Sequence, residues 1–319
     1  MSIRAFKSAD VCALIDCWNA ALPADPISER VLVRKVLADP NLEPEGLLVA
    51  EAKGRIAGFA VSYVRRVPLG DQWEPEWAWL TAFGVHPAAR GAGLGSALLA
   101  AVDAFARSRN RRFIGFAPYA PGYFVPGIDR ARYPAGAALL QSAGYARLYE
   151  CVAMDASLTH YQLPEVVTAL VAERVGQGYR FGTLAAGDVL ETARFAAAEF
   201  GPDWGRAVRD AVSRGVPLDH FRLARDPHGE VVGFAMYGGY DHSPSRFGPF
   251  GVAERERGKG LGKILLHQTM QDMAAAGLHD CWFLWTGEKS PAGQLYLRSG
   301  FRVTRRFEVL RKSLAAPRP

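Results

Sequence analysis

The sequence predicts an α/β protein made of two copies of one domain, and three observations support this. A phrase of 17 residues occurs twice, as FGVHPAARGAGLGSALL at 83–99 and as FGVAERERGKGLGKILL at 250–266, with ten identical positions and no gap. The strands and helices predicted around the two phrases follow the same order. The length of 319 residues corresponds to about two domains of ordinary size.

The elements of the first copy follow from the spacing of its apolar residues. Alternating segments on either side of Lys53-Gly54 predict a β-hairpin. Apolar residues at helical spacing after the first phrase predict a helix that begins at its glycines. In chain order the predicted elements are a strand at 2–5, helices at 10–21 and 28–38, hairpin strands at 46–51 and 56–64, a strand at 77–85 and a helix at 93–107.

The second copy repeats this order around a hairpin that turns at 226–229. A helix at 163–175, with Pro164 in its first turn, connects the copies. We therefore expect an N-terminal domain at 1–157 and a C-terminal domain at 158–319. The other predicted elements are strands at 179–184, 221–224, 231–237, 246–252 and 280–285 and helices at 186–200, 205–213, 260–276 and 291–299.

The charge balance disfavours nucleic acid as a partner. Lys and Arg number 38 against 32 Asp and Glu, which gives a net charge of +6, but the arginines are scattered. Neither a long basic run nor a basic stripe with interleaved aromatic residues is present. This surface charge suits attraction of a phosphorylated small ligand.

The sequence predicts a cytoplasmic protein without a metal site. No apolar run is long enough to cross a bilayer, and Asp10 and Asp16 interrupt the N-terminal segment where a signal peptide would be apolar. The cysteines show neither disulfide nor metal-ligand spacing, so we expect reduced structural thiols. They are Cys12, Cys17, Cys151 and Cys281.

The repeated phrase has the chemistry of a phosphate-binding turn. Glycines let a ligand approach the backbone, and the N–H groups at a helix start bind phosphate oxygens. Arg90 and Arg257 stand where a guanidinium can add charge-assisted contacts. The spacing G-x-G-x-G matches neither the dinucleotide fingerprint nor the P-loop. The alternative is a tight turn whose glycines serve packing alone.

The R-G-x-G-x-G turn after a strand that ends in Val, with a later G-[YF] pair, resembles the GNAT (Gcn5-related) N-acetyltransferases. The resemblance covers nearly the whole chain twice and implies two tandem GNAT-like domains, each a mixed, mostly antiparallel sheet flanked by helices. It implies that the turn holds the pyrophosphate of acetyl-CoA and that the preceding strand pairs with pantetheine. The implied cofactor contacts are Phe83, Gly84, Val85, Arg90, Gly91, Ala92, Gly93, Leu94, Gly95 and Ser96 in the first copy, and Phe250, Gly251, Val252, Arg257, Gly258, Lys259, Gly260, Leu261, Gly262 and Lys263 in the second.

The two copies differ at the position of the family's general acid, a tyrosine four residues before the G-[YF] glycine. The second copy has Tyr296 there and the first has Leu140, which cannot donate a proton. The resemblance thus implies that the C-terminal domain is catalytic, with Tyr296 as general acid, and that the N-terminal domain is impaired or specialised. The alternative for Tyr296 is simple packing of its ring. The candidate general bases are Glu74, Glu76, Asp241, His242, Glu254 and Glu256.

These features predict an acetyl-CoA-dependent N-acetyltransferase that acts on a small-molecule primary amine by direct attack, without nucleic acid or membrane, as a monomer or homodimer. A tandem arrangement also occurs in the family's mycothiol-synthesising members, but no residue singles out that substrate. The alternative is a non-catalytic acyl-CoA-binding sensor or scaffold. The loop at 116–133, rich in Pro, Gly and aromatic residues, is expected to be functional or to cover an interface. Candidate acceptor-site aromatics are Tyr237, Tyr240, Trp282 and Trp285.

Overall fold

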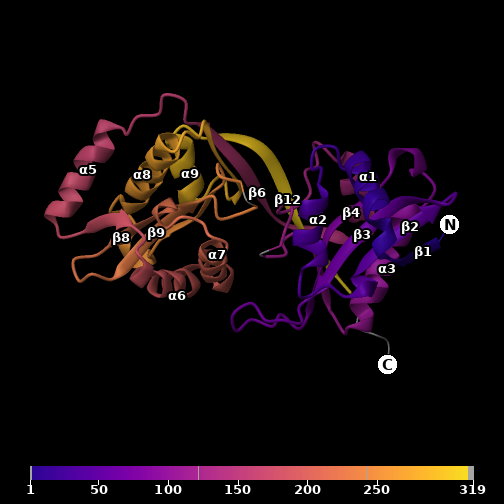
Figure 1. Ribbon diagram of the computed structural model, residues 1–319. Coiled ribbons are helices and arrows are strands. Elements are labelled where there is room, and N and C mark those ends of the chain that lie inside the picture. Colours follow the sequence, from indigo (N-terminus) through magenta and orange to yellow (C-terminus); the bar gives the residue numbers. More distant parts are fainter. Residues whose placement is uncertain (1, 121, 242, 315–319) are drawn as a thin grey trace. The chain divides into compact units, whose positions relative to one another are not determined.

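The computed structural model describes residues 2–120, 122–241 and 243–314, and its contacts divide the chain into two compact units (Figure 1). Unit 1 comprises the residues up to Pro68, Trp73–Cys151 and the chain from Arg305 on, and unit 2 comprises Leu69–Gln72 and Val152–Thr304. Each unit contains one copy of the repeated phrase. The division by contacts is not continuous in sequence, whereas the boundary after residue 157 stays a prediction about where the copies meet along the chain.

Unit 1 contains a mixed sheet in the strand order β1-β2-β3-β4-β5-β12. The first four strands pair antiparallel, β4 and β5 pair parallel, and the end of β12 pairs antiparallel with β5. The fold class predicted from the sequence is therefore confirmed for this copy. The strands are β1 (Ser2–Ala5), β2 (Leu47–Ala52), β3 (Arg55–Val64), β4 (Trp77–Val85), β5 (Phe113–Phe116) and β12 (Arg302–Ser313).

Helices cover both faces of this sheet. Phe59, Val61 and Tyr63 of β3 pack with the helices on one face, and Ala60 and Val64 pack on the other, as the alternation of a strand requires. The first face carries α1 (Val11–Ala21) and α2 (Glu29–Leu32), which continues as a π-helical turn at Val33–Leu37. The second face carries α3 (Leu94–Ser108) and α4 (Pro134–Ser142).

Unit 2 repeats this layering around an antiparallel sheet in the order β10-β9-β8-β7. Phe234 and Met236 of β9 pack with α6 and α7, and Ala235 and Tyr237 face the cluster that contains α8 and α9. The strands are β7 (Arg180–Thr183), β8 (Phe221–Arg225), β9 (Val231–Tyr237), β10 (Phe247–Val252) and β11 (Asp280–Thr286). The helices are α5 (Glu165–Gly176), α6 (Val189–Phe200), α7 (Pro202–Ser213), α8 (Leu261–Ala275) and α9 (Pro291–Arg298).

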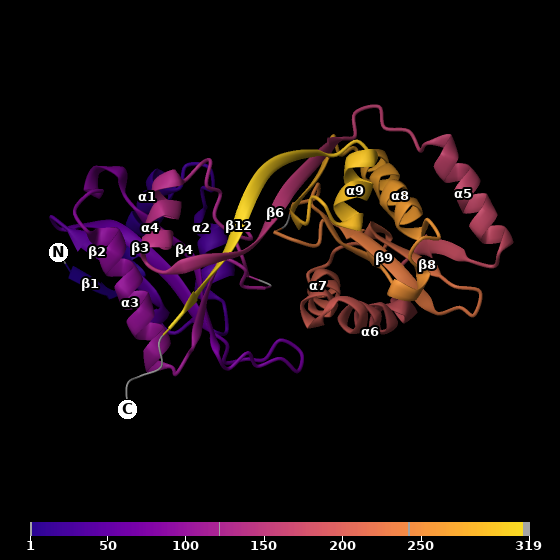
Figure 2. The same cartoon turned by 180° about the vertical axis from the view of Figure 1, so that it is seen from behind.

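Two long strands, β6 (Tyr145–Ser157) and β12, belong to both units (Figure 2). The second part of β6 pairs with β11 in unit 2, and the last residues of β12 pair with β5 in unit 1. These strands are not evident from their sequences, because β12 is rich in charged residues and both strands are exposed over part of their length. Their conformation depends on partners far away in sequence.

Buried groups in unit 2 give a testable pH dependence. His267 on α8 is only 5% exposed, and its Nδ1 lies 2.6 Å from the hydroxyl of Tyr161. Burial, aided by the charge of Lys263, lowers the pKa of His267 to about 4 from its ordinary 6.5. The imidazole of His267 therefore binds a proton more readily in the unfolded chain than in the folded chain. The stability that the folded state gains from the neutral imidazole is present above pH 6.5 and is lost as the pH falls toward 4.

We expect the substitution His267→Gln to reduce the loss of unfolding free energy between neutral pH and about pH 4.5 by about 2 kcal/mol. The measurement is urea denaturation of the wild type and the variant at both pH values. The carboxylates titrate equally in both proteins, so the difference in pH dependence between the two proteins isolates the contribution of His267. An identical pH dependence in the two proteins would refute this assignment.

The described part of the chain contains no helix long and apolar enough to cross a membrane. All four cysteines are free thiols. Burial raises the pKa of Cys17 to about 11 and that of Cys151 to about 12, which keeps these thiols protonated and unreactive.

Candidate functional site

The pairing of the parallel strands β4 and β5 stops before the first copy of the phrase. Only Trp77–Leu80 of β4 pairs with β5, at Phe113–Phe116, while β4 itself continues to Val85. On its other side β4 stays paired with β3 as far as Val85. Among the described residues, no strand pairs with 81–85 on the β5 side. A free strand edge of this kind can hydrogen-bond an extended ligand.

The first turn, Arg90–Ser96, follows this edge and is open to solvent. Gly91 and Gly93 have positive φ angles of 80° and 78°, and no atom lies within 4 Å of a Cβ added at either position. Gly93 precedes the 15-residue helix α3, whose first N–H groups and dipole favour an anion. The Arg90 Nε donates to the Val85 carbonyl (3.2 Å), and its Nη2 donates to the Ala21 carbonyl (3.3 Å).

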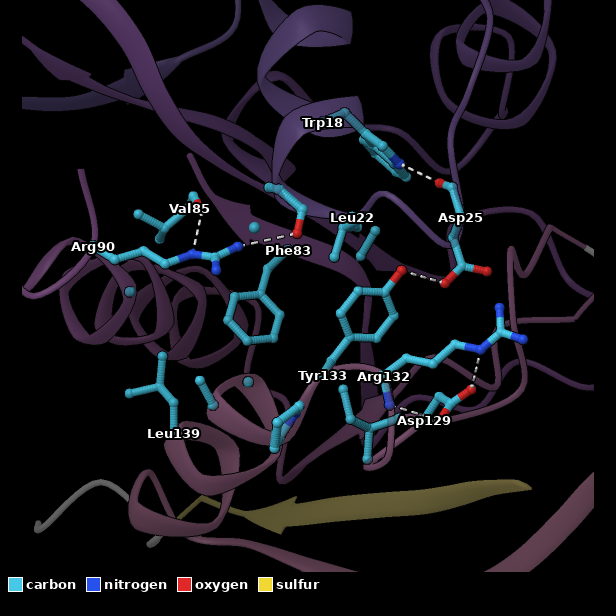
Figure 3. A pocket seen from close by; sticks show the side chains of 18 of the residues that line it. Trp18, Leu22, Asp25, Phe83, Val85, Arg90, Asp129, Arg132, Tyr133 and Leu139 are labelled. Carbon is cyan, nitrogen blue, oxygen red and sulfur yellow. Dashed lines mark hydrogen bonds and ion pairs between the residues drawn. The ribbon is translucent and has the colours of Figure 1, made fainter. Parts of the chain in front are cut away.

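A cavity of about 530 Å³ connects the first turn to the free edge of β4 (Figure 3). A site of this size suits a small molecule. The apolar side chains of Leu22, Phe83 and Leu139 form part of its wall. The long loop at 116–133 contributes Phe124, Val125, Gly127, Ile128 and Asp129 to the lining. Of the residues predicted to contact the cofactor in the first copy, all but Ala92 line this cavity.

The far end of the cavity is polar and was not foreseen from the sequence. The Tyr133 hydroxyl donates to Asp25 Oδ2 (2.7 Å; Figure 3). The Ala24 N–H donates to the Tyr133 oxygen (3.1 Å). Burial, reinforced by the Asp25 carboxylate, raises the pKa of Tyr133 far above its usual value. The phenol therefore stays protonated at physiological pH. Its position directly before the P-A-G start of α4 is the one sequence signal that points to it.

Arg305 joins this polar end from β12. Its Nη1 and Nη2 lie 2.6 Å and 3.0 Å from the two oxygens of Asp25, and its Nε lies 2.9 Å from Asp129 Oδ2. Asp129 also accepts from the N–H of Arg132 (3.1 Å). Arg305 lies more than 170 residues from both carboxylates in the sequence, so sequence analysis does not predict that it pairs with them.

The second turn, Arg257–Lys263, has the same backbone but different surroundings. A Cβ added to Gly260 would lie 2.7 Å from the Leu170 side chain of α5, a helix that precedes the second copy. The Phe200 ring packs on Gly251, where an added Cβ would lie 2.4 Å from the ring. At the matching Gly84 in unit 1, an added Cβ would lie 2.8 Å from both the Ala21 side chain and the Phe59 ring, so this strand position is closely packed in both copies. The turns differ at Gly260, which lies against Leu170, whereas the matching Gly93 has no neighbour within 4 Å.

Tyr296 lies in the core of unit 2, only 6% exposed. Its ring centroid is 4.4 Å from that of Phe283 and 5.3 Å from that of Phe301, and Phe247 and Phe250 lie within 6.1 Å. Burial raises its pKa far above the usual value. Leu140, at the same place in the first copy, is also completely buried in its core. Both positions thus pack in the same way.

The predicted general bases lie in ion pairs outside the cavity of unit 1. Glu74 pairs with Arg65 (2.6 Å), and Glu76 with Arg112. The other pairs are Asp241 with Arg246, Glu254 with Arg257 (3.3 Å), and the buried Glu256 with Lys259 (2.9 Å). His242 lies outside the described residues.

The acceptor-site aromatics of the second copy also have structural partners. Tyr237 stacks on His220 at 4.0 Å between ring centroids. Tyr240 and Trp282 lie 4.8 Å and 5.4 Å from the guanidinium of Arg246. Trp285 lies at the end of β11.

Two profiles of one family match the chain, one in each copy. The profile for the acetyltransferase (GNAT) family matches residues 14–120, and the profile for the acetyltransferase (GNAT) domain matches residues 217–303. Together they span more than half of the sequence. The chain belongs to the GNAT family of N-acetyltransferases, with two GNAT domains in tandem. As an enzyme of this family, it is an acetyltransferase that uses acetyl-CoA.

Individual proteins support the tandem arrangement. A mycothiol acetyltransferase from Saccharomonospora viridis is 28% identical over 317 residues, which cover 90% of this chain and 95% of that protein. A tandem GNAT protein from the clavulanic acid biosynthesis pathway has a similar fold (TM-score 0.66, 18% identity, 100% of this chain and 99% of that one). The GCN5-related glucosamine N-acetyltransferase region of a fungal multi-domain β-N-acetylglucosaminidase gives a TM-score of 0.81 at 19% identity. In that case the match covers 97% of this chain and spans only 38% of the fungal one.

Proposed function

We propose that the chain transfers an acetyl group from acetyl-CoA to the primary amine of a small molecule, and that the reaction takes place in the cavity of unit 1. One observation carries this proposal: a single cavity joins the first turn, the free edge of β4 and the polar end at Asp25 and Tyr133. The names of the relatives, mycothiol acetyltransferase among them, support a small-molecule acceptor.

The residues around the first turn fit acetyl-CoA. The exposed Gly91 and Gly93 leave room beside the backbone that any side chain would narrow, and the start of α3 offers N–H groups to a pyrophosphate. The free edge of β4 at 81–85 offers backbone groups to an extended pantetheine chain. When bound there, acetyl-CoA supplies the activated acetyl thioester.

The chemistry then needs an oriented amine, a polarised carbonyl and a proton for the departing thiolate. Backbone N–H groups of the β4 edge would stabilise negative charge on the carbonyl oxygen of a thioester bound beside them. As the amine nitrogen bonds to the acetyl carbon, the carbon–sulfur bond breaks and the sulfur takes a proton. We assign this proton to the Tyr133 hydroxyl, since the first copy has Leu140 at the usual tyrosine position. The nitrogen releases a proton as the amide forms, and a proton taken up from solvent restores the Tyr133 hydroxyl.

This proposal moves the expected chemistry from the second copy to the first. In unit 2 the side chains of Leu170 and Phe200 occupy space beside the turn and the strand. For the second copy we propose, at most, binding of acyl-CoA without turnover. The cofactor contacts predicted at Phe250–Val252 and Arg257–Lys263 remain a prediction that binding stoichiometry can test.

The two tyrosines make a matched pair of variants, because Tyr→Phe removes one hydroxyl at either site. We expect Tyr133→Phe to lower kcat by about 100-fold, the usual contribution of a general acid. We expect Tyr296→Phe to change kcat by less than twofold, since its buried ring keeps its packing. The measurement is kcat across pH 6 to 9. The reverse pattern would restore Tyr296 as the general acid and remove Tyr133 from this role.

The activity itself is tested by thiol release from acetyl-CoA with a panel of primary amines: glucosamine, spermidine, tryptamine and L-lysine. Mass spectrometry of the products identifies N-acetylation. Peptides are added to the panel as a further class of amine. If the protein binds acetyl-CoA but releases no thiol with any of these amines, the result would favour the sensor function instead.

A further inference from the structure

The cavity of unit 1 depends on a residue that comes after the repeated phrase of the second copy, near the end of that copy in sequence. We propose that Arg305 is a positioning residue for the acetyl-transfer site of the first copy, acting through Asp25 and Asp129. The inference rests on the proposed function, because it assumes that this cavity is the active site. It adds a requirement: the site of the first copy is complete only when the last strand of the chain is in place.

The first argument is the geometry of the Arg305 clamp, which we define as Arg305 with Asp25 and Asp129. The Nη1 and Nη2 atoms of Arg305 donate hydrogen bonds to the two carboxylate oxygens of Asp25, and its Nε donates to Asp129 Oδ2. Asp25 belongs to the segment after α1, and Asp129 belongs to the loop at 116–133. A planar guanidinium with fixed donor directions can bridge these two carboxylates, whereas the single ammonium group of lysine cannot reproduce the fork.

The second argument is burial. The side chains are only 11% exposed for Arg305, 17% for Asp25 and 4% for Asp129. Removal of the arginine would leave two carboxylates in a partly desolvated site with one charge partner fewer. The guanidinium also lies over the Phe307 ring, at 4.7 Å from its centroid, which fixes its direction.

The third argument is that the same strand holds the loop. The N–H and carbonyl of Ile128 exchange hydrogen bonds with those of Glu308, both 2.9 Å long. The Glu308 carboxylate takes two hydrogen bonds from Arg130, of 2.9 Å and 2.8 Å. A Cβ added to Gly127 would lie 2.3 Å from the Glu308 carbonyl oxygen, so the loop backbone sits directly on β12. The loop and Asp25 are therefore set by one strand.

The fourth argument is the position of the clamp in the cavity. Arg305, Asp25 and Asp129 line its polar end, and Tyr133 donates its hydroxyl to the carboxylate that Arg305 grips. The first turn lies at the other end of the lining and makes no described contact with Arg305. Displacement of the clamp should therefore disturb the amine and the proton donor while leaving the phosphate end of acetyl-CoA in place.

The test compares three variants of the full chain. Arg305→Met removes the charge but keeps an unbranched side chain, and Arg305→Lys keeps the charge without the fork. Arg306→Met is the matched control, because it removes the same charge from the adjacent exposed residue, which points to the other side of the strand. The readouts are the acetyl-CoA dissociation constant from calorimetry, kcat and KM for the panel amine with the highest rate, and hydrogen exchange of the amides at 22–28 and 122–133.

We expect Arg305→Met to reduce kcat/KM for the amine at least 30-fold while the acetyl-CoA dissociation constant changes less than threefold. Arg305→Lys should recover part of this loss, and Arg306→Met should behave as wild type. Exchange should accelerate in the two named segments of Arg305→Met. Unchanged kcat/KM in Arg305→Met would overturn the proposal, as would equal losses in acetyl-CoA affinity and amine turnover, which indicate a merely structural role.

The two hypotheses fail in different ways. If the wild type releases no thiol with any amine, the proposed function fails, and hydrogen exchange alone decides the role of Arg305. Faster exchange confined to 22–28 and 122–133 would then support the clamp. Exchange identical to wild type in both segments would refute it.

Discussion

Ser96→Asp is expected to weaken acetyl-CoA binding by about 100-fold. Ser96 is the third residue of α3 and lines the cavity beside the first turn. A carboxylate there would repel the pyrophosphate that the first turn is proposed to bind. Two like unit charges about 5 Å apart repel each other by about 3 kcal/mol at the effective dielectric constant of a protein surface, which corresponds to about 100-fold in affinity. The helix itself would not suffer, because an acidic residue in the first turn of a helix is stabilising.

The second copy provides a matched control for this variant. Lys263 is the third residue of α8, at the same place in the second turn. We expect Lys263→Asp to leave kcat/KM of the enzyme within threefold of wild type, because the proposed reaction takes place in unit 1. Calorimetry with acetyl-CoA measures both variants. Loss of binding and activity in Lys263→Asp, with neither lost in Ser96→Asp, would return the active site to the second copy.

Trp18→Ala is expected to reduce the free energy of unfolding of unit 1 by about 3–5 kcal/mol. The indole is 1% exposed and stacks on Phe59 with 4.5 Å between ring centroids. Its Nε1 donates to the Asp25 carbonyl (3.0 Å), so the same side chain supports the core and the polar end of the cavity (Figure 3). Urea denaturation measures the loss.

Trp18→Phe separates these two contributions. It keeps most of the ring stacking and removes the hydrogen bond to Asp25, which should cost about 1 kcal/mol for the bond plus a smaller packing term. We expect its kcat/KM for the amine to fall more than its stability would require, since Asp25 loses a support. Wild-type activity in Trp18→Phe would show that this hydrogen bond does not position Asp25.

The sequence predicts the parts of the site that depend on local structure. The strand at 77–85 and the helix after the first turn were foreseen because their signals are short-range: apolar spacing, and glycines before a helix. The loop at 116–133 is expected from its composition to be functional or to cover an interface; it lines the cavity, and its function stays a prediction. The predicted link between the copies, a helix at 163–175, is the observed α5.

The parts that sequence analysis missed depend on contacts between distant residues. The clamp brings together Asp25, Asp129 and Arg305, and only the path of β12 makes them neighbours. The similarity of the two turns suggests two equal sites, but the sequence of a turn does not determine which side chains pack around it. Ala21 and Phe59 lie against Gly84, whereas Phe200 lies against the matching Gly251. The repeated phrase does not include these neighbours, so its sequence does not predict them.

The most direct test of the account is a crystal structure of the full chain soaked with acetyl-CoA. The account predicts density that begins at Gly91–Ser96, follows the edge of β4 and places the thioester sulfur near the Tyr133 hydroxyl. Acetyl-CoA bound only at the second turn, with its sulfur near Tyr296 and the cavity of unit 1 empty, would contradict it.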